Sequence, residues 1–178
     1  MEDLLTYYIG YRVREFRLDK KYLTSLGLLL RESQNFTPLH YALRIKCLQA
    51  EKTHEGIFRA VADELQDPTS ICSVADQMMV DGGLNFGRLV VLIAYSGYLC
   101  NYLAQKRKWT TLVTIIENLY RFFKLNISPW VCANGGLESL QNFLIVLLEK
   151  NSRFHWFNQY ALLTVCALAV LFMFRKHL

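Results

Sequence analysis

The sequence predicts an all-α protein: a helical bundle around a central apolar helical hairpin, followed by a C-terminal tail-anchor helix. Three observations predict it. Residues 89–104 carry no charge and are apolar on every side, as in a helix buried in a bundle or inserted in a membrane. Residues 110–124 then repeat apolar side chains at helical spacing, which favours a hairpin of two packed helices. Residues 160–174 form a further apolar run near the C-terminus.

Length and composition agree with one domain and a tail. The chain has 178 residues, is 53% hydrophobic and carries a formal net charge of +5. Its basic residues lie in short clusters, which are typical of solvated helix ends and leave attraction to anionic lipid as the alternative. No basic face interleaved with aromatics is present, so we expect no nucleic-acid partner. We expect a helical domain at 1–150, a juxtamembrane linker at 151–159 and a tail-anchor helix at 160–174.

No chemical constellation stands out. The five cysteines are odd in number and form no C-x-x-C pair, which favours buried, reduced thiols in a cytosolic domain. The four histidines lack metal-ligand spacing, and there is no G-x-S-x-G elbow. We therefore predict a protein that is not an enzyme, with no catalytic residue, metal, cofactor or small-molecule substrate. Its exposed apolar surface should serve association with other proteins.

The first half of the chain predicts helices with one apolar side. The first covers Leu4 to Val13, whereas residues 17–37 read equally as a short helix or a packed connector. Thr37 and Pro38 are a preferred N-cap and first helical residue. The apolar pattern then continues to about residue 66, and Asp67-Pro68 ends that helix. A short helix with two methionines is expected at 71–80, where core packing and a binding surface are both possible roles.

The second half predicts the hairpin and two further helices. Asn85 is the expected N-cap of the central helix, and a basic turn separates it from the helix at 110–124. Ser128-Pro129 is expected to start a new short helix with a cap and a proline. Gly135-Gly136 is expected to end it, and residues 137–149 form the next helix.

Arg88 is the one charge in the first turn of the central helix. No carboxylate lies three or four positions away on either side. Arginine binds a carboxylate with two parallel hydrogen bonds, so Arg88 could hold an acid brought by another protein. The alternative is that Arg88 pairs with a distant acid of its own chain, such as Asp63 or Asp81, and only helps the chain to fold.

The apolar run at 160–174 is short for a membrane span. At 1.5 Å per residue it covers about 22 Å, against about 30 Å of hydrocarbon. Trp156 and Phe157 can extend it at the interface, and Arg153 and Arg175 flank it. We expect a tail anchor with the domain left in the cytosol. The alternative is a last helix that folds onto a groove of its own domain.

Two ordered motifs resemble those of the Bcl-2 family. Asn85-Phe86-Gly87-Arg88 is similar to the family's N-W-G-R, and residues 129–136, with Trp130 and two glycines, are similar to W-x-x-x-x-G-G-W. The resemblance covers Leu4 to Leu178 and implies a Bcl-2-like helical bundle. Two positions depart from the pattern. Leu137 stands where the second tryptophan belongs, and Leu48 stands where the family's third motif, L-x-x-x-G-D, has its aspartate.

The apolar surface and the resemblance together predict helix-in-groove binding. The resemblance implies that the ligands are BH3 helices (helices that carry the third homology motif) of pro-apoptotic relatives. It also implies that Arg88 takes the ligand's aspartate, that Asn85 hydrogen-bonds nearby and that Gly87 permits close approach. The predicted partner-binding residues are His54, Phe58, Val61, Val74, Ala75, Met78, Met79, Asn85, Gly87, Arg88, Leu89, Val90 and Val91. His54 is read as a packed or rim histidine rather than a metal ligand.

The resemblance implies an apoptosis regulator, and the departure at Leu48 favours an inhibitor that captures BH3 helices. The compact chain resembles smaller pro-survival members, cellular (an avian branch) or viral. The expected location is the mitochondrial outer membrane, with the endoplasmic reticulum membrane or cytosol as alternatives. One alternative function is a death effector of the same fold that permeabilises that membrane. Another is a small membrane protein with spans at 89–105, 110–124 and 160–174, which Arg88 just before the first span and Glu117 and Arg121 in the second disfavour.

Overall fold

The computed structural model describes residues 1–14, 16, 37–64, 75 and 83–149. The described residues form helices and no strand, which confirms the all-α bundle. The expected linker and tail anchor, the connector at 17–36 and all of 71–80 except Ala75 lie outside the described residues. The elements are α1 (Glu2–Val13), α3 (Pro38–Thr53), α4 (Glu55–Glu64), α6 (Phe86–Gln105), α7 (Trp109–Phe122), the π-helical turn η1 (Phe123–Ile127), α8 (Ser128–Ala133) and α9 (Gly136–Glu149).

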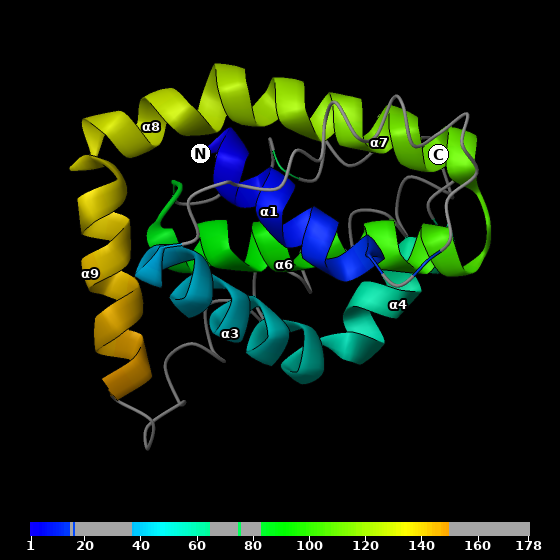
Figure 1. The fold of residues 1–178 in the computed structure, drawn as a ribbon, viewed down its shortest axis with the longest axis horizontal. Helices are drawn as coiled ribbons and strands as arrows, with labels where there is room; N and C mark the ends of the chain where they lie inside the picture. The colour runs from blue at the N-terminus through cyan, green and yellow to red at the C-terminus, as the bar shows by residue number, and fades with distance from the viewer. Residues whose placement is uncertain (15, 17–36, 65–74, 76–82, 150–178) are drawn as a thin grey trace.

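The central helix α6 is wrapped by the other helices. Figure 1 shows α6 running through the middle of the bundle, with α7 along one side, α3 along the other and α1 across it. A turn at residues 106–108, in which Arg107 adopts a left-handed φ of 55°, joins α6 to α7 and confirms the hairpin. Among the described residues α6 is the one unbroken helix apolar and long enough to cross a membrane, and most of it is buried inside the bundle. The bundle therefore accounts for its uncharged sequence as a core.

Helix α1 is fastened to both α6 and α3. At Gly97 a Cβ atom would lie 2.4 Å from Cε1 of Tyr8, so α1 reaches α6 this closely only because residue 97 is glycine. The Tyr8 hydroxyl donates to the Glu51 carboxylate of α3 at 2.6 Å, and Arg12 pairs with the same carboxylate at 2.8 Å. Burial raises the pKa of the Glu51 carboxyl, while the contacts with Tyr8 and Arg12 act in the opposite direction.

Helix α3 starts as predicted and lies close against α6. Thr37 is its N-cap with extended backbone, and the Thr37 N–H donates to Nδ1 of His40 at 3.3 Å, as in a capping box. Further along, the buried Cys47 thiol donates to the Val90 carbonyl at 3.6 Å. A small residue at position 47 therefore lets the two helices approach closely.

The single helix expected from residue 38 to about 66 is wrong, because the structure breaks it at His54. His54 has φ −112° and ψ 17°, outside helical geometry, and separates α3 from α4. The apolar period did not reveal the break, since His54, Phe58 and Val61 remain buried on both sides of it. The N–H of Phe58 still bonds to the His54 carbonyl at 2.9 Å, so the chain turns a corner without losing that hydrogen bond.

Helix α8 begins at Ser128 as expected, but no interruption precedes it and Ser128 does not cap it. The chain runs from α7 through η1 into α8 without interruption. The Ser128 hydroxyl caps no helix and instead donates to the Glu2 carboxylate of α1 at 3.1 Å. Pro129 has no N–H for a regular helical bond, and the wider π-helical turn before it accommodates that loss.

Helix α9 is held at its C-terminal end by a buried lysine of α3. The Lys46 ammonium donates to the Leu147 carbonyl at 2.8 Å and to the Gln49 side chain at 3.0 Å. Carbonyls in the last turn of a helix have no partner within the helix, so Lys46 supplies one. Burial lowers the pKa of Lys46, which is only 4% exposed.

Candidate partner-binding site

Arg88 lies in the first turn of α6, at the N-terminal end of the helix. Asn85 is the N-cap as predicted: its backbone is extended, and its side-chain oxygen accepts from the Arg88 N–H at 2.9 Å. The Arg88 guanidinium donates through Nη1 to the Gly83 carbonyl at 2.9 Å, so the side chain folds back over the turn before the helix. Arg88 and Gly87 are half-buried and Asn85 is exposed. These three predicted site residues therefore remain at the surface of the bundle.

The structure excludes an ion pair between Arg88 and Asp63, one of the two acids of its own chain that the sequence offers as a partner. The Asp63 carboxylate accepts a hydrogen bond from the Tyr102 hydroxyl. Tyr102 lies fourteen positions after Arg88 on the same straight helix, about 21 Å along its axis. Asp63 therefore belongs to the other end of α6. The second proposed acid, Asp81, lies outside the described residues.

Seven of the predicted partner-binding residues are buried in the structure, with an exposed fraction of 8% or less each. They are His54, Phe58, Val61, Ala75, Leu89, Val90 and Val91. The sequence predicts that they line an open groove, whereas the structure covers them. Val74, Met78 and Met79 lie outside the described residues. A partner could contact the buried positions only after part of the bundle moves.

Phe58 of α4 is the centre of the closed region. Its ring contacts Tyr95 at 5.2 Å and Tyr98 at 5.7 Å, both at edge-to-face angles near 60°, and the His54 ring lies 6.0 Å away. Sequence reasoning missed Tyr95 and Tyr98. A signal was present, because positions 88, 91, 95, 98 and 102 follow steps of three and four along α6. We call these five positions the α6 stripe.

His54 should make stability depend on pH. Its ring is buried, and Nε2 has no hydrogen-bond partner in the part of the chain that the structure describes. Burial lowers the pKa of the imidazole below its ordinary 6.5. The unfolded chain therefore takes up the proton first as pH falls, so the stabilisation is complete above pH 6.5 and is lost as pH falls through the folded-state pKa.

We expect wild type to lose free energy of unfolding relative to His54→Phe between pH 7.5 and pH 5. Urea unfolding of both proteins over that range measures the difference, which cancels the titration of the other three histidines. A difference that stays constant with pH would contradict a buried, neutral His54.

The two sequence motifs meet in space. Phe86 of the first motif contacts Trp130 of the second edge-to-face, with ring centroids 5.3 Å apart, and Phe143 of α9 lies 5.8 Å from Phe86. The N-terminal end of α6 is therefore held by α8 and α9. Neither motif alone predicts this contact.

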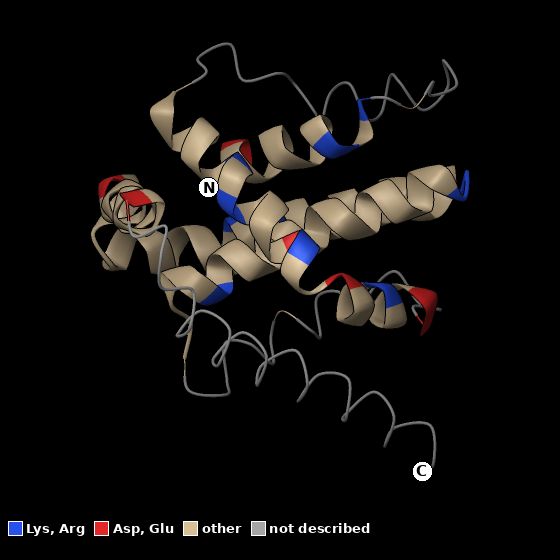
Figure 2. Ribbon diagram, turned by 90° about the horizontal axis from the view of Figure 1, so that it is seen from below, with Lys and Arg blue, Asp and Glu red and all other residues tan. Residues whose placement is uncertain are grey.

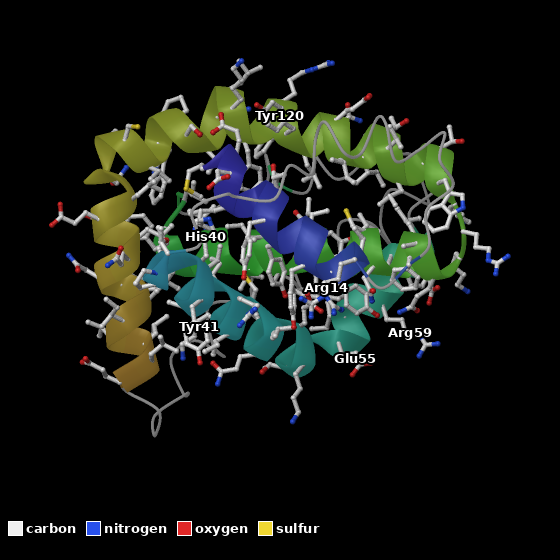
Figure 3. The ribbon with its side chains drawn as sticks, viewed as in Figure 1. Arg14, His40, Tyr41, Glu55, Arg59 and Tyr120 are labelled. Carbon is white, nitrogen blue, oxygen red and sulfur yellow. The ribbon has the colours of Figure 1, made fainter. Side chains whose placement is uncertain are left out.

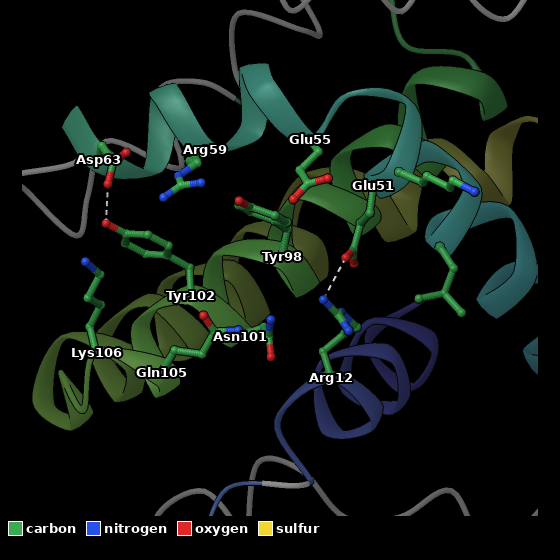
Figure 4. Close-up of a pocket in the computed structure, with 12 residues that line it drawn as sticks. Arg12, Glu51, Glu55, Arg59, Asp63, Tyr98, Asn101, Tyr102, Gln105 and Lys106 are labelled. Atoms are coloured by element: carbon green, nitrogen blue, oxygen red, sulfur yellow. Dashed lines mark hydrogen bonds and ion pairs between the residues drawn. The ribbon is translucent and has the colours of Figure 1, made fainter.

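A polar pocket of about 580 Å³ lies at the opposite end of α6 (Figure 4). Figure 4 shows side chains of α1, α3, α4 and α6 pointing into it. Figure 3 places Glu55 and Arg59 at the α4 end of the bundle, away from α9. Figure 2 shows that α4 carries charges of both signs, whereas the ribbon of α6 is uncharged along its middle. The lining residues are Arg12, Leu48, Glu51, Lys52, Glu55, Arg59, Asp63, Tyr98, Asn101, Tyr102, Gln105 and Lys106.

These features define a bundle of amphipathic helices around one buried apolar helix, with an arginine at the N-terminal end of that helix. A family described as apoptosis regulator proteins of the Bcl-2 family matches residues 43–136, which include both motifs. The chain belongs to the Bcl-2 family of apoptosis regulators. The solved structure of Trichuris suis BCL-2 is similar in fold, with a TM-score of 0.62 and 22% sequence identity over 84% of this chain and 91% of that one.

Proposed function

We propose that this protein is an apoptosis inhibitor that binds BH3 helices of pro-apoptotic relatives along the α6 stripe, with Arg88 as the anchor for the ligand's aspartate. The observation that carries this proposal is the placement of Arg88. Its guanidinium is half-buried at the end of an apolar stripe and donates to a neutral carbonyl, that of Gly83. An ionised carboxylate is a stronger acceptor for a guanidinium than a carbonyl is.

The groove opens by movement of α4. This helix is separated from α3 by the break at His54, which is a corner about which it can turn. Its described links to α6 include the Phe58 ring contacts and the hydrogen bond between Asp63 and Tyr102. A ligand helix that inserts apolar side chains beside Tyr95 would cover the apolar surface that Phe58 covers in the closed structure. Opening and binding therefore exchange one apolar contact for another.

Leu48 favours an inhibitor over an effector. In the family's third motif the aspartate at this position is the group that another member's groove arginine binds. Here a half-buried leucine of α3 faces the polar pocket instead. Helix α3 would therefore be a poor ligand for a relative. Arg88, in contrast, would still let this protein act as the receptor that binds a ligand's aspartate.

The proposed location is the mitochondrial outer membrane, with the domain in the cytosol. The apolar run at 160–174, flanked by aromatic and basic residues, supports a tail anchor. Fractionation of cells that express the full chain and a variant ending at residue 153 tests this location. Equal recovery of both proteins in the membrane fraction would contradict a tail anchor.

Titration calorimetry of the full chain in nanodiscs with a panel of BH3 peptides tests the binding function. Dye release from liposomes tests the direction of regulation. An inhibitor releases no dye alone and suppresses the release caused by a pro-apoptotic relative. Release by this protein on its own, stimulated by a BH3 peptide, would instead support the effector function.

A further inference from the structure

We infer that the polar pocket is a second anchor for the same ligand helix and takes a carboxylate about four turns before the ligand's aspartate. The inference rests on the proposed function and deepens it. The α6 stripe starts at Arg88 and ends at Tyr102, which lines the pocket. An aspartate on Arg88 therefore fixes which ligand residue reaches the other end. The distance of about 21 Å corresponds to about 14 residues of a helix that lies along the stripe.

The order of ligand residues sets the direction. In the motif L-x-x-x-G-D the leucine lies five residues before the aspartate, about 7.5 Å along a helix. The apolar part of the stripe, with Tyr95 and its contact Phe58, lies on the same side of Arg88 as the pocket. The ligand's N-terminal part therefore points toward the pocket. A short ligand ends before it, and only an N-terminal extension fills it.

The charges of the pocket favour a carboxylate. Its lining has four basic and three acidic side chains. Glu51 is paired with Arg12, and Asp63 accepts from Tyr102. Arg59 makes no hydrogen bond or ion pair in the part of the chain that the structure describes, and it is exposed on the pocket wall. Figure 4 shows the Arg59 guanidinium pointing into the space between α4 and α6. An acid of the ligand could take two parallel hydrogen bonds from it.

The location of Arg59 also links this contact to groove opening. Arg59 lies on α4, directly after Phe58 in the chain, so it moves with the helix that must leave α6. A ligand acid bound to Arg59 would hold α4 in its displaced position, on the far side of the ligand.

Calorimetry with designed peptides tests the second anchor on the full chain in nanodiscs. The short peptide contains the leucine-to-aspartate motif and one flanking turn at each end. The extended peptides add four turns at the N-terminus and carry Glu, Ala or Lys fourteen residues before the aspartate. A peptide with Glu sixteen residues before it, on another face of the helix, is the positional control. Proteins are wild type, Arg59→Ala, Arg59→Glu and the control Arg121→Ala, an exposed arginine of α7.

We expect the extended Glu peptide to bind wild type and Arg121→Ala about fivefold more tightly than the Ala peptide, as for a good surface ion pair. Arg59→Ala should abolish the difference, and Arg59→Glu should make the Lys peptide the tightest. Equal affinities of the Glu, Ala and Lys peptides for wild type would overturn the second anchor while the short peptide still binds through Arg88. A short peptide that does not bind wild type at all overturns the proposed function, and the second anchor with it.

Discussion

Replacement of Arg88 by alanine or glutamate is expected to weaken BH3-helix binding by roughly 30-fold to several thousand-fold. Removing one member of a buried charge pair at an interface costs about 2–5 kcal/mol, which corresponds to that range. The loss arises largely because the ligand's aspartate would remain buried without its partner. The fold should be retained, since Arg88 is half-buried in the first turn of α6, and the cap formed by Asn85 uses the backbone N–H of residue 88.

Calorimetric titration with one BH3 peptide measures the effect, and thermal unfolding of each variant checks the fold. Arg121→Ala is the matched control, because it removes an exposed arginine from α7. Arg88→Lys should give an intermediate loss, since a lysine keeps the charge but not the two parallel hydrogen bonds. Unchanged affinity of folded Arg88→Ala would exclude Arg88 as the anchor.

Local signals predicted much of the fold. The cap at Asn85 and the uncharged run after it predicted α6, and Thr37-Pro38 predicted the start of α3. Each signal needs only neighbouring residues. The break at His54 could not be predicted in this way, because buried positions continue through it at helical spacing. The continuous passage into α8 was missed because Ser128-Pro129 resembles a helix start, whereas Ser128 is used by a tertiary contact to Glu2.

The same distinction between local signals and tertiary contacts applies to the candidate site. The position of Arg88 follows from its motif, and the structure keeps it at the mouth of α6. The closure of the apolar positions does not follow from the sequence, because it depends on Phe58 packing against Tyr95 and Tyr98 of another helix. The polar pocket was not predicted at all. Four separate helices contribute its lining, so no residue spacing within one segment predicts the pocket.

Gly97→Ala is expected to destabilise the fold by about 1–3 kcal/mol, the usual cost of overpacking a core. The new Cβ atom would lie 2.4 Å from Cε1 and 2.7 Å from Cδ1 of Tyr8. The Tyr8 ring is fully buried and its hydroxyl is bonded to Glu51, so it cannot turn away without breaking that contact. For a chain of this size each kcal/mol lowers Tm by about 2–4 °C.

Gly56→Ala is the matched control for this prediction. Gly56 is exposed in α4 with no atom near its Cβ position, so alanine there should be neutral or stabilising by up to about 1 kcal/mol. Adding Tyr8→Ala should make Gly97→Ala cheaper than it is alone, because the clashing ring is gone, and a double-mutant cycle measures this coupling. Additive effects would contradict the close approach of α1. Gly97 faces α1, whereas Arg88 lies at the proposed groove, so the folded fraction of Gly97→Ala should keep its BH3 affinity. Stability and binding are thereby separated on one helix.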